Sequence, residues 1–416
     1  MATEYPWPTR PLGNAGTWLS GGTPSKDNSA FWSGTVPWVS PKDMKAARIG
    51  DAIDHVSNAA VGNGTRLVPS DTLLMVVRGM ILAHTFPVAL TTSEVAFNQD
   101  IKALQAARDF LPDFLLYWLQ SRAAEILKLT DVANHGTRRL PTERLFALET
   151  PVPPLPEQRK IAAILSAVDE VIEKTEAVIE SLQALKKAMM QELLTRGLPG
   201  RHTRFKQTEI GEVPEGWEVV ELGQVATVGN GSTPSRANDD YWIGGSIPWL
   251  PTGKVNDVVV QEADEFVTEK ALAECPIRLL PAGTILVAMI GQGKTRGKVA
   301  YLALPACINQ NFAYISPNKH LRSWFCFYYL HWKYETLRAS GRGSNQDALN
   351  CAIIRKFHLP LPPVHEQDAI SNALASLHDA ELKEYAVVGS LTVAKSALMS
   401  VLLSGELRVT PDQDVA

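Results

Sequence analysis

Residues 151–158 read PVPPLPEQ and residues 360–367 read PLPPVHEQ, so one pattern occurs twice, 209 positions apart. The prolines in each copy favour extended backbone, because a residue that precedes proline is pushed out of the helical region. Directly after each copy, the apolar residues take up the heptad spacing of a long helix. Each copy therefore marks the point where a module ends and a long helix begins.

The repeat extends over almost the whole chain. Trp7 and Leu12-Gly13 return as Trp217 and Leu222-Gly223, displaced by 210 positions. Further matched segments, displaced by 210 to 212 positions, are 22–25 with 232–235, 31–32 with 241–242, 37–39 with 248–250, 71–74 with 283–286 and 98–99 with 309–310. This period is too long for a solenoid, so the chain is a duplicated domain.

Each copy has the same internal order. Short β-like runs with Gly, Pro, Ser and Asn turns lead to an aromatic-rich helix at 115–119 or 324–330, then to the proline stretch and the long helix. The sequence predicts an α+β protein with two β-rich domains related by internal duplication and separated by two long helices. We expect the helices to pack as an antiparallel coiled coil, although the heptads alone do not fix their orientation.

The two helices share a broad apolar stripe. Each runs for roughly 35 residues, or about 50 Å at 1.5 Å per residue, and each ends at a helix-stopping glycine, Gly197 or Gly405. The positions expected to pack the helices or dock a partner are Ile161, Ile164, Val168, Val171, Leu182, Leu185, Ile370, Leu377, Val387, Leu391 and Leu398.

Composition narrows the class of protein. The chain has 416 residues, 45% hydrophobic and 20% charged, and its formal net charge of −4 argues against a uniformly basic nucleic-acid binder. Residues 360–416 hold 3 basic and 8 acidic residues, so any phosphate contact must come from local basic clusters. The N-terminus shows neither the basic start nor the apolar stretch of a secretory signal, and we expect a cytoplasmic protein with no membrane contact.

Motifs for catalysis are missing from the sequence. There is no Asn/Asp-Pro-Pro-aromatic motif for adenine methylation, no GxSxG and no HExxH, and the histidines are scattered, so we predict no catalytic residues and no metal site. The segment Gly291–Thr295 resembles a phosphate loop, but Ala288 replaces its first glycine and a strand-like run follows it. A basic, Gly-rich hairpin is the better interpretation of this segment.

At this point the residues resemble a known family. The order of a β-rich module, PVPPLPEQRKIAAIL, a heptad helix, a linker with EIGEVPEGWE at 209–218 and then a second copy is similar to the specificity (S) subunit of Type I restriction-modification systems. The resemblance spans essentially the whole chain. It implies target recognition domains at 1–150 and 217–359, conserved helical spacers at 151–200 and 360–405, a linker at 201–216 and a C-terminal tail at 406–416.

The resemblance also implies partners. Each recognition domain would read one half of a bipartite, asymmetric site in double-stranded DNA, while the helices set the gap and dock two modification (methyltransferase) subunits. S-adenosylmethionine, ATP and Mg would be bound by those subunits and by the restriction (translocase/nuclease) subunits, and no cofactor by this chain. Because the chain begins almost directly in the first module, a circular arrangement would have to close through the C-terminal tail.

Candidate DNA contacts lie in turns and loops at matching places in both copies. Hydroxyl and basic side chains can position phosphates, whereas Arg, Asn and Gln can read base edges in the major groove. The candidates are Thr23, Ser25, Lys26, Lys42, Arg138, Arg139, Thr233, Ser235, Arg236, Lys254, Lys294, Arg296, Lys298, Arg342, Asn345 and Gln346. For each one, a solvated turn charge or a purely structural turn is the alternative.

Three other functions stay open from the sequence. The same modules could form the DNA-recognition arm of another methyltransferase or nuclease system. The chain could instead hydrolyse a nucleotide at Gly291–Thr295, or act as a coiled-coil scaffold without DNA contact.

Overall fold

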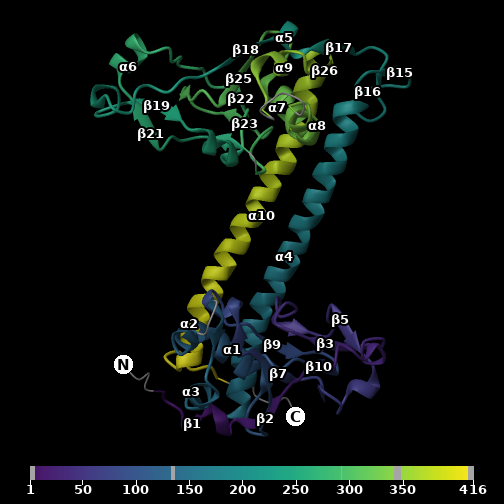
Figure 1. The fold of residues 1–416 in the computed structure, drawn as a ribbon, viewed down its shortest axis with the longest axis vertical. Coiled ribbons are helices and arrows are strands. Elements are labelled where there is room, and N and C mark those ends of the chain that lie inside the picture. The colour runs from purple at the N-terminus through teal and green to yellow at the C-terminus, as the bar shows by residue number, and fades with distance from the viewer. Residues whose placement is uncertain (1–4, 133–135, 292, 342–347, 411–416) are drawn as a thin grey trace. The chain divides into compact units, whose positions relative to one another are not determined.

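The computed structural model describes residues 5–132, 136–291, 293–341 and 348–410. The chain divides into a first unit, formed by residues 1–176 and 386–416, and a second unit, formed by residues 177–385. Each unit holds one β-rich module together with one end of each long helix (Figure 1).

The first unit is built on a five-stranded sheet. In sheet order its strands are β2 (Gly16–Ser20), β11 (Ile101–Ala106), β7 (Thr72–Val76), β9 (Val88–Thr91) and β4 (Arg48–Ile49). Only the β9–β4 pair is parallel. Three smaller sheets have the orders β5 (Asp54–Val56), β3 (Val36–Val39), β10 (Val95–Phe97), β6 (Arg66–Val68); β12 (Asp131–Val132), β13 (Arg138–Arg139), β8 (Arg78–Gly79); and β1 (Thr9–Pro11), β14 (Glu149–Pro151).

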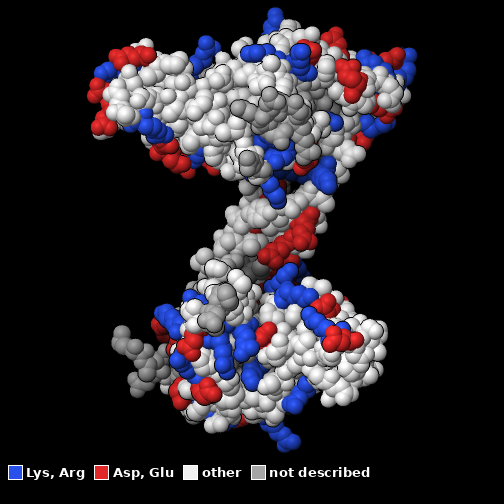
Figure 2. Space-filling model, in the orientation of Figure 1, with Lys and Arg blue, Asp and Glu red and all other residues white. Residues whose placement is uncertain are grey.

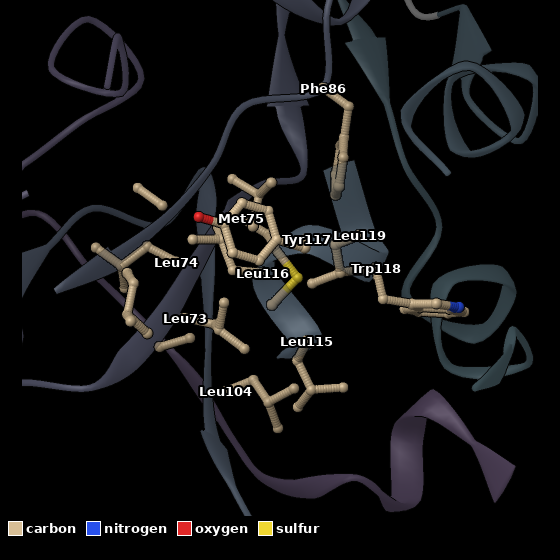
Figure 3. Close-up of a cluster of buried hydrophobic side chains, with 14 of the residues drawn as sticks. Leu73, Leu74, Met75, Phe86, Leu104, Leu115, Leu116, Tyr117, Trp118 and Leu119 are labelled. Atoms are coloured by element: carbon tan, nitrogen blue, oxygen red, sulfur yellow. The ribbon is translucent and has the colours of Figure 1, made fainter. Parts of the chain in front are cut away.

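The core of the first unit lies between this sheet and helix α1 (Pro112–Ser121). All five residues of β7 are buried, and so is the apolar run from Phe114 to Leu119 in α1 (Figure 3). Proline at the start of α1 is compatible with its first turn, where the missing N–H has no helical partner. Two short helices, α2 (Ala123–Lys128) and α3 (Thr142–Phe146), complete this module.

The second unit repeats this design. Its five-stranded sheet has the order β18 (Ala226–Asn230), β25 (Phe312–Pro317), β22 (Ile285–Ala288), β23 (Val299–Leu302), β20 (Val259–Val260). The smaller sheets are β21 (Glu265–Val267), β19 (Ile247–Leu250), β24 (Cys307–Ile308); β17 (Glu218–Glu221), β26 (His358–Leu361); and β15 (Phe205–Thr208), β16 (Gly211–Pro214). Its short helices are α5 (Leu222–Val225), α6 (Glu269–Glu274), α7 (Ser323–Trp332), α8 (Tyr334–Ala339) and α9 (Cys351–Arg355).

Strand directions agree as well as strand order. In both units three of the four strand pairs of the large sheet are antiparallel, and the pair that contains the last strand, β4 or β20, is parallel. The predicted internal duplication and the α+β class are therefore confirmed.

The two long helices are α4 (Leu155–Thr195) and α10 (Val364–Ser404), each of 41 residues. Each begins at the residue that directly follows the double proline of its repeat. In the first unit Asp169 of α4 pairs with Lys395 of α10 at 2.6 Å, and in the second unit Lys186 pairs with Glu381 at 3.0 Å. Partners early in one helix are thus late in the other within each unit, so the predicted antiparallel packing is confirmed.

By length and composition alone, α10 could cross a membrane, with a mean hydropathy of 1.8 over its most apolar 18 residues. Both of its ends, however, lie in protein cores. Ile370 and Leu374 belong to the core of the second unit, and Leu402 and Leu403 to that of the first. With its ion pairs to α4, α10 is one member of a packed helix pair rather than a membrane span.

Gly405 ends α10 in a left-handed conformation with φ of 78°. A Cβ atom there would lie 2.4 Å from Pro6 Cγ and 2.8 Å from Trp7 Cζ3. We expect Gly405→Ala to lower the free energy of unfolding by about 2 kcal/mol, because both strain and a clash oppose it. Urea unfolding followed by tryptophan fluorescence measures the change.

Gly389→Ala is the matched control, because Gly389 lies inside α10 and nothing would lie within 4 Å of its added Cβ. This change should raise the free energy of unfolding by up to about 1 kcal/mol through helix propensity. Equal effects of the two substitutions would contradict the prediction for Gly405.

Candidate nucleic-acid interface

Each proline stretch ends in a glutamate whose side chain is buried. In the first unit, Glu157 is 3% exposed and accepts a hydrogen bond from Trp7 Nε1 at 3.0 Å. Arg408, from the C-terminal tail, donates from Nε and Nη2 to the same carboxylate at 2.7 and 2.9 Å. Burial acts to raise the pKa of Glu157, but the bonds from Arg408 and Trp7 outweigh it and hold the pKa below its ordinary value. The tail and the N-terminal segment thus meet at one carboxylate.

The second unit contains the matching cluster. Glu366 is 1% exposed and accepts a hydrogen bond from Trp217 Nε1 at 3.2 Å. Its other oxygen lies 2.7 Å from His202 Nε2, in the segment that follows α4. We call these two clusters the carboxylate clamps. In each clamp, the basic residue comes from the segment after one long helix and the glutamate from the start of the other.

The glutamine after each glutamate has a different partner. Gln158 accepts a hydrogen bond from the backbone N–H of Leu111 at 2.7 Å and donates to the carbonyl of Asp109 at 2.8 Å, just before α1. Gln367 makes the equivalent bonds to Arg322 and His320, just before α7. The Glu-Gln pair therefore fixes each long helix both to the clamp and to the module's aromatic helix.

The predicted Thr/Ser turns wrap around paired tryptophans. The indole N–H of Trp32 donates to the carbonyl of Ser25 at 3.1 Å, and that of Trp242 donates to Ser235 at 3.1 Å. The hydroxyls of Thr23 and Thr233 donate to Gln99 and Gln310. Trp38 and Trp249, which stack edge-on against the first pair, are 6% and 2% exposed. The tryptophans thus act as structural anchors, with the turns on the surface above them.

Acidic and basic side chains are interspersed on the visible face of each unit (Figure 2). Several predicted basic contacts already have acidic partners. Lys42 pairs with Asp54 at 2.7 Å, and Lys254, whose side chain is 11% exposed, pairs with Asp257 at 2.8 Å and with Asp264 at 3.3 Å. Their charges are neutralised within the module.

The matched residues Lys26 and Arg236 differ in their surroundings. Arg236 pairs with Glu265 and lies over the rings of Trp242 and Trp249, at 3.7 and 4.8 Å from their centroids. Lys26 is exposed in the first unit. The two copies therefore present different surfaces at the same turn.

Three arginines gather on the small sheet of the first unit. Arg139 on β13 is directly opposite Arg78 on β8. Arg138, the preceding residue of β13, donates a hydrogen bond to the hydroxyl of Thr130 at 3.2 Å. Residues directly opposite in an antiparallel pair share a face, and like charges there repel unless an anion intervenes. Sequence reasoning missed Arg78, because only strand pairing brings it beside Arg139.

The basic loop of the second unit connects β22 to β23. The N–H of Ala288 donates to the carbonyl of Lys298 at 3.0 Å, so the loop closes a hairpin, as predicted, and a strand rather than a helix follows it. Lys294 is exposed, and Lys298 donates to Asn256 at 2.7 Å. Arg342, Asn345 and Gln346, also predicted to contact DNA, lie outside the described residues.

Arg296 of this loop is 7% exposed. Among the described residues, its Nε atom has no hydrogen-bond partner, and no carboxylate forms an ion pair with it. Two residues that sequence reasoning missed hold the loop backbone. Arg338 donates to the carbonyls of Gly293 and Arg296, and Tyr334 donates to that of Lys294.

The predicted helix positions fall into three classes. Ile161 and Ile370 are fully buried, whereas Val171, Leu185 and Val387 are 47%, 47% and 43% exposed. The remaining positions are half-buried: Ile164, Val168, Leu182, Leu377, Leu391 and Leu398. Further exposed apolar residues on the helices are Val178, Leu382, Tyr385 and Val393.

Comparison with known proteins gives a consistent result. The family model described as Type I restriction modification DNA specificity domain matches residues 5–184 and 214–386. The EcoR124I/EcoR124II specificity subunit of Escherichia coli is 34% identical over 181 residues, which cover 43% of this chain and 44% of that one. The putative MjaX specificity subunit of Methanocaldococcus jannaschii is 31% identical, covering 72% of this chain and 68% of that protein.

Similarity to the MjaIX specificity subunit of the same archaeon extends over 97% of this chain and 94% of that one, at 24% identity. The crystal structure of a Type I restriction-modification S subunit from M. genitalium superposes with a TM-score of 0.61 at 15% identity, covering 97% of both chains. A chain from a study of complex assembly in the type I R-M system gives 0.59 at 18% identity, covering 97% of this chain and 100% of that one. At these identities the two structures support the fold.

Glu157→Gln tests the first carboxylate clamp. At neutral pH the substitution should lower the free energy of unfolding by about 2 kcal/mol, because it weakens charge-assisted hydrogen bonds. The folded-state pKa of Glu157 lies below its ordinary value of 4.5, so the stabilisation is complete above pH 4.5 and is lost as the pH falls through the folded-state pKa. Urea unfolding at a series of pH values should show the variant and the wild type converging in acid.

The exposed Glu149 provides the control, and Glu149→Gln should change stability by less than about 0.5 kcal/mol. A difference between Glu157→Gln and the wild type that stays constant down to the most acidic pH would contradict the role assigned to this carboxylate.

Proposed function

Because the chain belongs to the family of Type I restriction-modification specificity subunits, we propose that it selects the DNA target of such a complex by reading a bipartite, asymmetric site, one half with each module. As a specificity subunit, the chain is itself non-catalytic. The proposal rests chiefly on one observation. The two units share strand order, tryptophan anchors and clamps, while their exposed loops carry different side chains.

The proposed recognition domains are residues 1–150 and 217–359, with spacers at 151–200 and 360–405, a linker at 201–216 and a tail at 406–416. In the first domain, exposed Lys26 and the arginine group on β8 and β13 are the best-supported contacts with double-stranded DNA, because they carry charge on the surface. In the second domain, Lys294 and Lys298 take this role. Lys42, Lys254 and Arg236 more directly stabilise the modules, through their ion pairs.

The long helices are proposed to set the gap between half-sites and to dock two modification subunits. Exposed Val171, Leu185 and Val387 favour docking, since apolar side chains exposed along a helix are typical of an interaction surface. S-adenosylmethionine would then be bound by the modification subunits, and ATP and Mg by restriction subunits where these join the complex. This chain would determine only which DNA sequence the complex acts on.

Helix length should determine spacer length. We expect insertion of four residues after Ala184 together with four after Ala380 to lengthen the unread gap by about two base pairs, because four helical residues add about 6 Å and a base pair about 3.4 Å. Both half-sites should stay the same. Co-expression with the modification subunit, followed by sequencing of methylated genomic DNA, measures the motif.

The control substitutes the four residues after Ala184 and the four after Ala380 without changing the helix length, and it should leave the gap unchanged. An active complex that keeps its original gap after the double insertion would refute the spacing role.

Exchange of residues 1–150 for those of another specificity subunit should change one half-site only.

Lys294 and Lys254 should behave differently when changed to alanine. For Lys294→Ala, the slope of log K against log salt concentration for DNA binding by the complex should become shallower by about 0.9, because one phosphate contact is lost. Lys254→Ala should keep the slope and lower the melting temperature, because Lys254 is nearly buried and already paired. Fluorescence anisotropy between about 50 and 200 mM salt measures the slopes. An unchanged slope for Lys294→Ala would remove this residue from the interface.

A further inference from the structure

The second unit contains a pocket of about 350 Å³ beside its basic loop. Its apolar lining is formed by Val255, Val258 and Val299, and its polar lining by Asn256, Lys294, Lys298, His331 and Tyr334. Ligand pockets in proteins start at about 300 Å³. The pocket is therefore large enough for one small organic ligand.

The loop beside this pocket differs between the two copies of the module. The loops 77–87 and 289–298 are equivalent, because each is closed by the same backbone bond, from Val76 to Pro87 and from Ala288 to Lys298. In the first unit, Leu82 and Phe86 of this loop are buried, 0% and 4% exposed, within the core. In the second loop the large apolar residues Met289 and Ile290 stand at its start, and the remainder reads GQGKTRGK over 291–298, without a large apolar side chain. The pocket thus lies beside a loop whose apolar content differs between the two copies.

The pocket walls are held in place before any ligand binds. Arg338 and Tyr334 fix three loop carbonyls through hydrogen bonds of 2.6 to 3.0 Å. Val258 has a φ of 63°, an uncommon conformation for a β-branched residue, and its carbonyl accepts a bond from the N–H of Tyr301 at 2.8 Å. Backbone strain of this kind concentrates at functional sites.

The charges around the pocket are unbalanced. Among the described residues no carboxylate lines it, and Lys298 is bonded to Asn256, which is neutral. Buried Arg296 adds a third positive charge in the same loop, without a carboxylate partner among the described residues. Apolar residues beside cations that form no ion pair among the described residues suit a ligand with a flat apolar part and an anionic group.

We propose that this pocket binds a single nucleotide unit, with its base against the valines and its phosphate at Lys294 and Lys298. This inference rests on the proposed function, which places DNA beside the same loop. The nucleotide has two possible sources, an unstacked nucleotide of the bound target or a free nucleotide. In both cases the recognition chemistry is the same.

Two variants test the pocket in different ways. Lys294→Ala combined with Lys298→Ala removes the phosphate-binding charges, and its control, Lys319→Ala combined with Lys356→Ala, removes the same charge from exposed positions elsewhere. Asn256→Trp keeps both lysines and places a bulky ring at the pocket from an exposed position. Neither test variant changes a buried core residue.

The first measurement places 2-aminopurine at each position of the half-site read by residues 217–359, leaving out the methylated adenine. In the complex with modification subunits, one position should brighten by about threefold on binding, because an unstacked base loses quenching by its neighbours. The increase should disappear in both test variants and persist in the control. This result identifies the DNA target as the source.

The second measurement uses deoxyadenosine monophosphate and the complex without DNA. Saturation-transfer NMR should detect its base protons in the wild type and the control, and not in the test variants. If the monophosphate gives this NMR signal and no 2-aminopurine position brightens, the ligand is a free nucleotide, and the result supports the proposed pocket. If neither signal occurs, or if both survive in the test variants, the pocket proposal is overturned.

The two proposals fail separately. A wild-type complex that methylates a split target but gives neither pocket signal refutes the nucleotide site alone. A complex that methylates no split target refutes the proposed function, and the monophosphate measurement then decides the pocket by itself.

Discussion

The fold depends on two buried carboxylates, Glu157 and Glu366, at the starts of the long helices. A buried, unpaired charge costs several kcal/mol, so each must find donors elsewhere in the chain. Trp7 and Arg408 supply them for Glu157, and Trp217 and His202 do so for Glu366. In both clusters the basic partner lies in the segment that follows the other long helix. The ion pair therefore brings the end of one helix to the start of the other, which is the antiparallel arrangement. The same glutamate also bonds to the first tryptophan of its module. In the first unit this requirement also brings the N-terminal and C-terminal segments together.

The same requirement explains which features the two copies share. Buried polar groups must be satisfied, so the glutamines at 158 and 367 and the tryptophan indoles make matching bonds in both units. Exposed loops have no such constraint. One copy fills the loop after its central strand with Leu82 and Phe86, whereas the other uses glycine and lysine. One scaffold can therefore carry two surfaces of different chemistry without a change in its internal bonding.

The sequence is sufficient to predict the duplication, the β-rich modules and the two long helices, because these follow from periodicity and from a repeated helix start. The antiparallel orientation of the helices is fixed only by contacts such as Asp169 with Lys395. The sequence does not separate surface charges from structural ones. Arg236 and Lys254 have the residue type of DNA contacts, but Glu265 and Asp264 neutralise them across strands that the sequence does not align. Conversely, Arg78 gains significance only through its pairing with Arg139. Residue roles of this kind depend on sheet register, which local patterns do not specify.

The helices combine fixed ends with apolar side chains that remain exposed. Burying one valine or leucine side chain contributes about 1.5–3 kcal/mol. The exposed side chains are Val171 and Val387 in the first unit and Leu185 and Leu382 in the second, and their burial by a partner would stabilise the complex. A partner that covers these side chains gains that energy without touching the carboxylate clamps, whose donors come from the chain itself. Under the proposed function, spacing and assembly would then be separable properties of the same helices, because helix length would set the gap between half-sites and the exposed apolar residues would bind the partner.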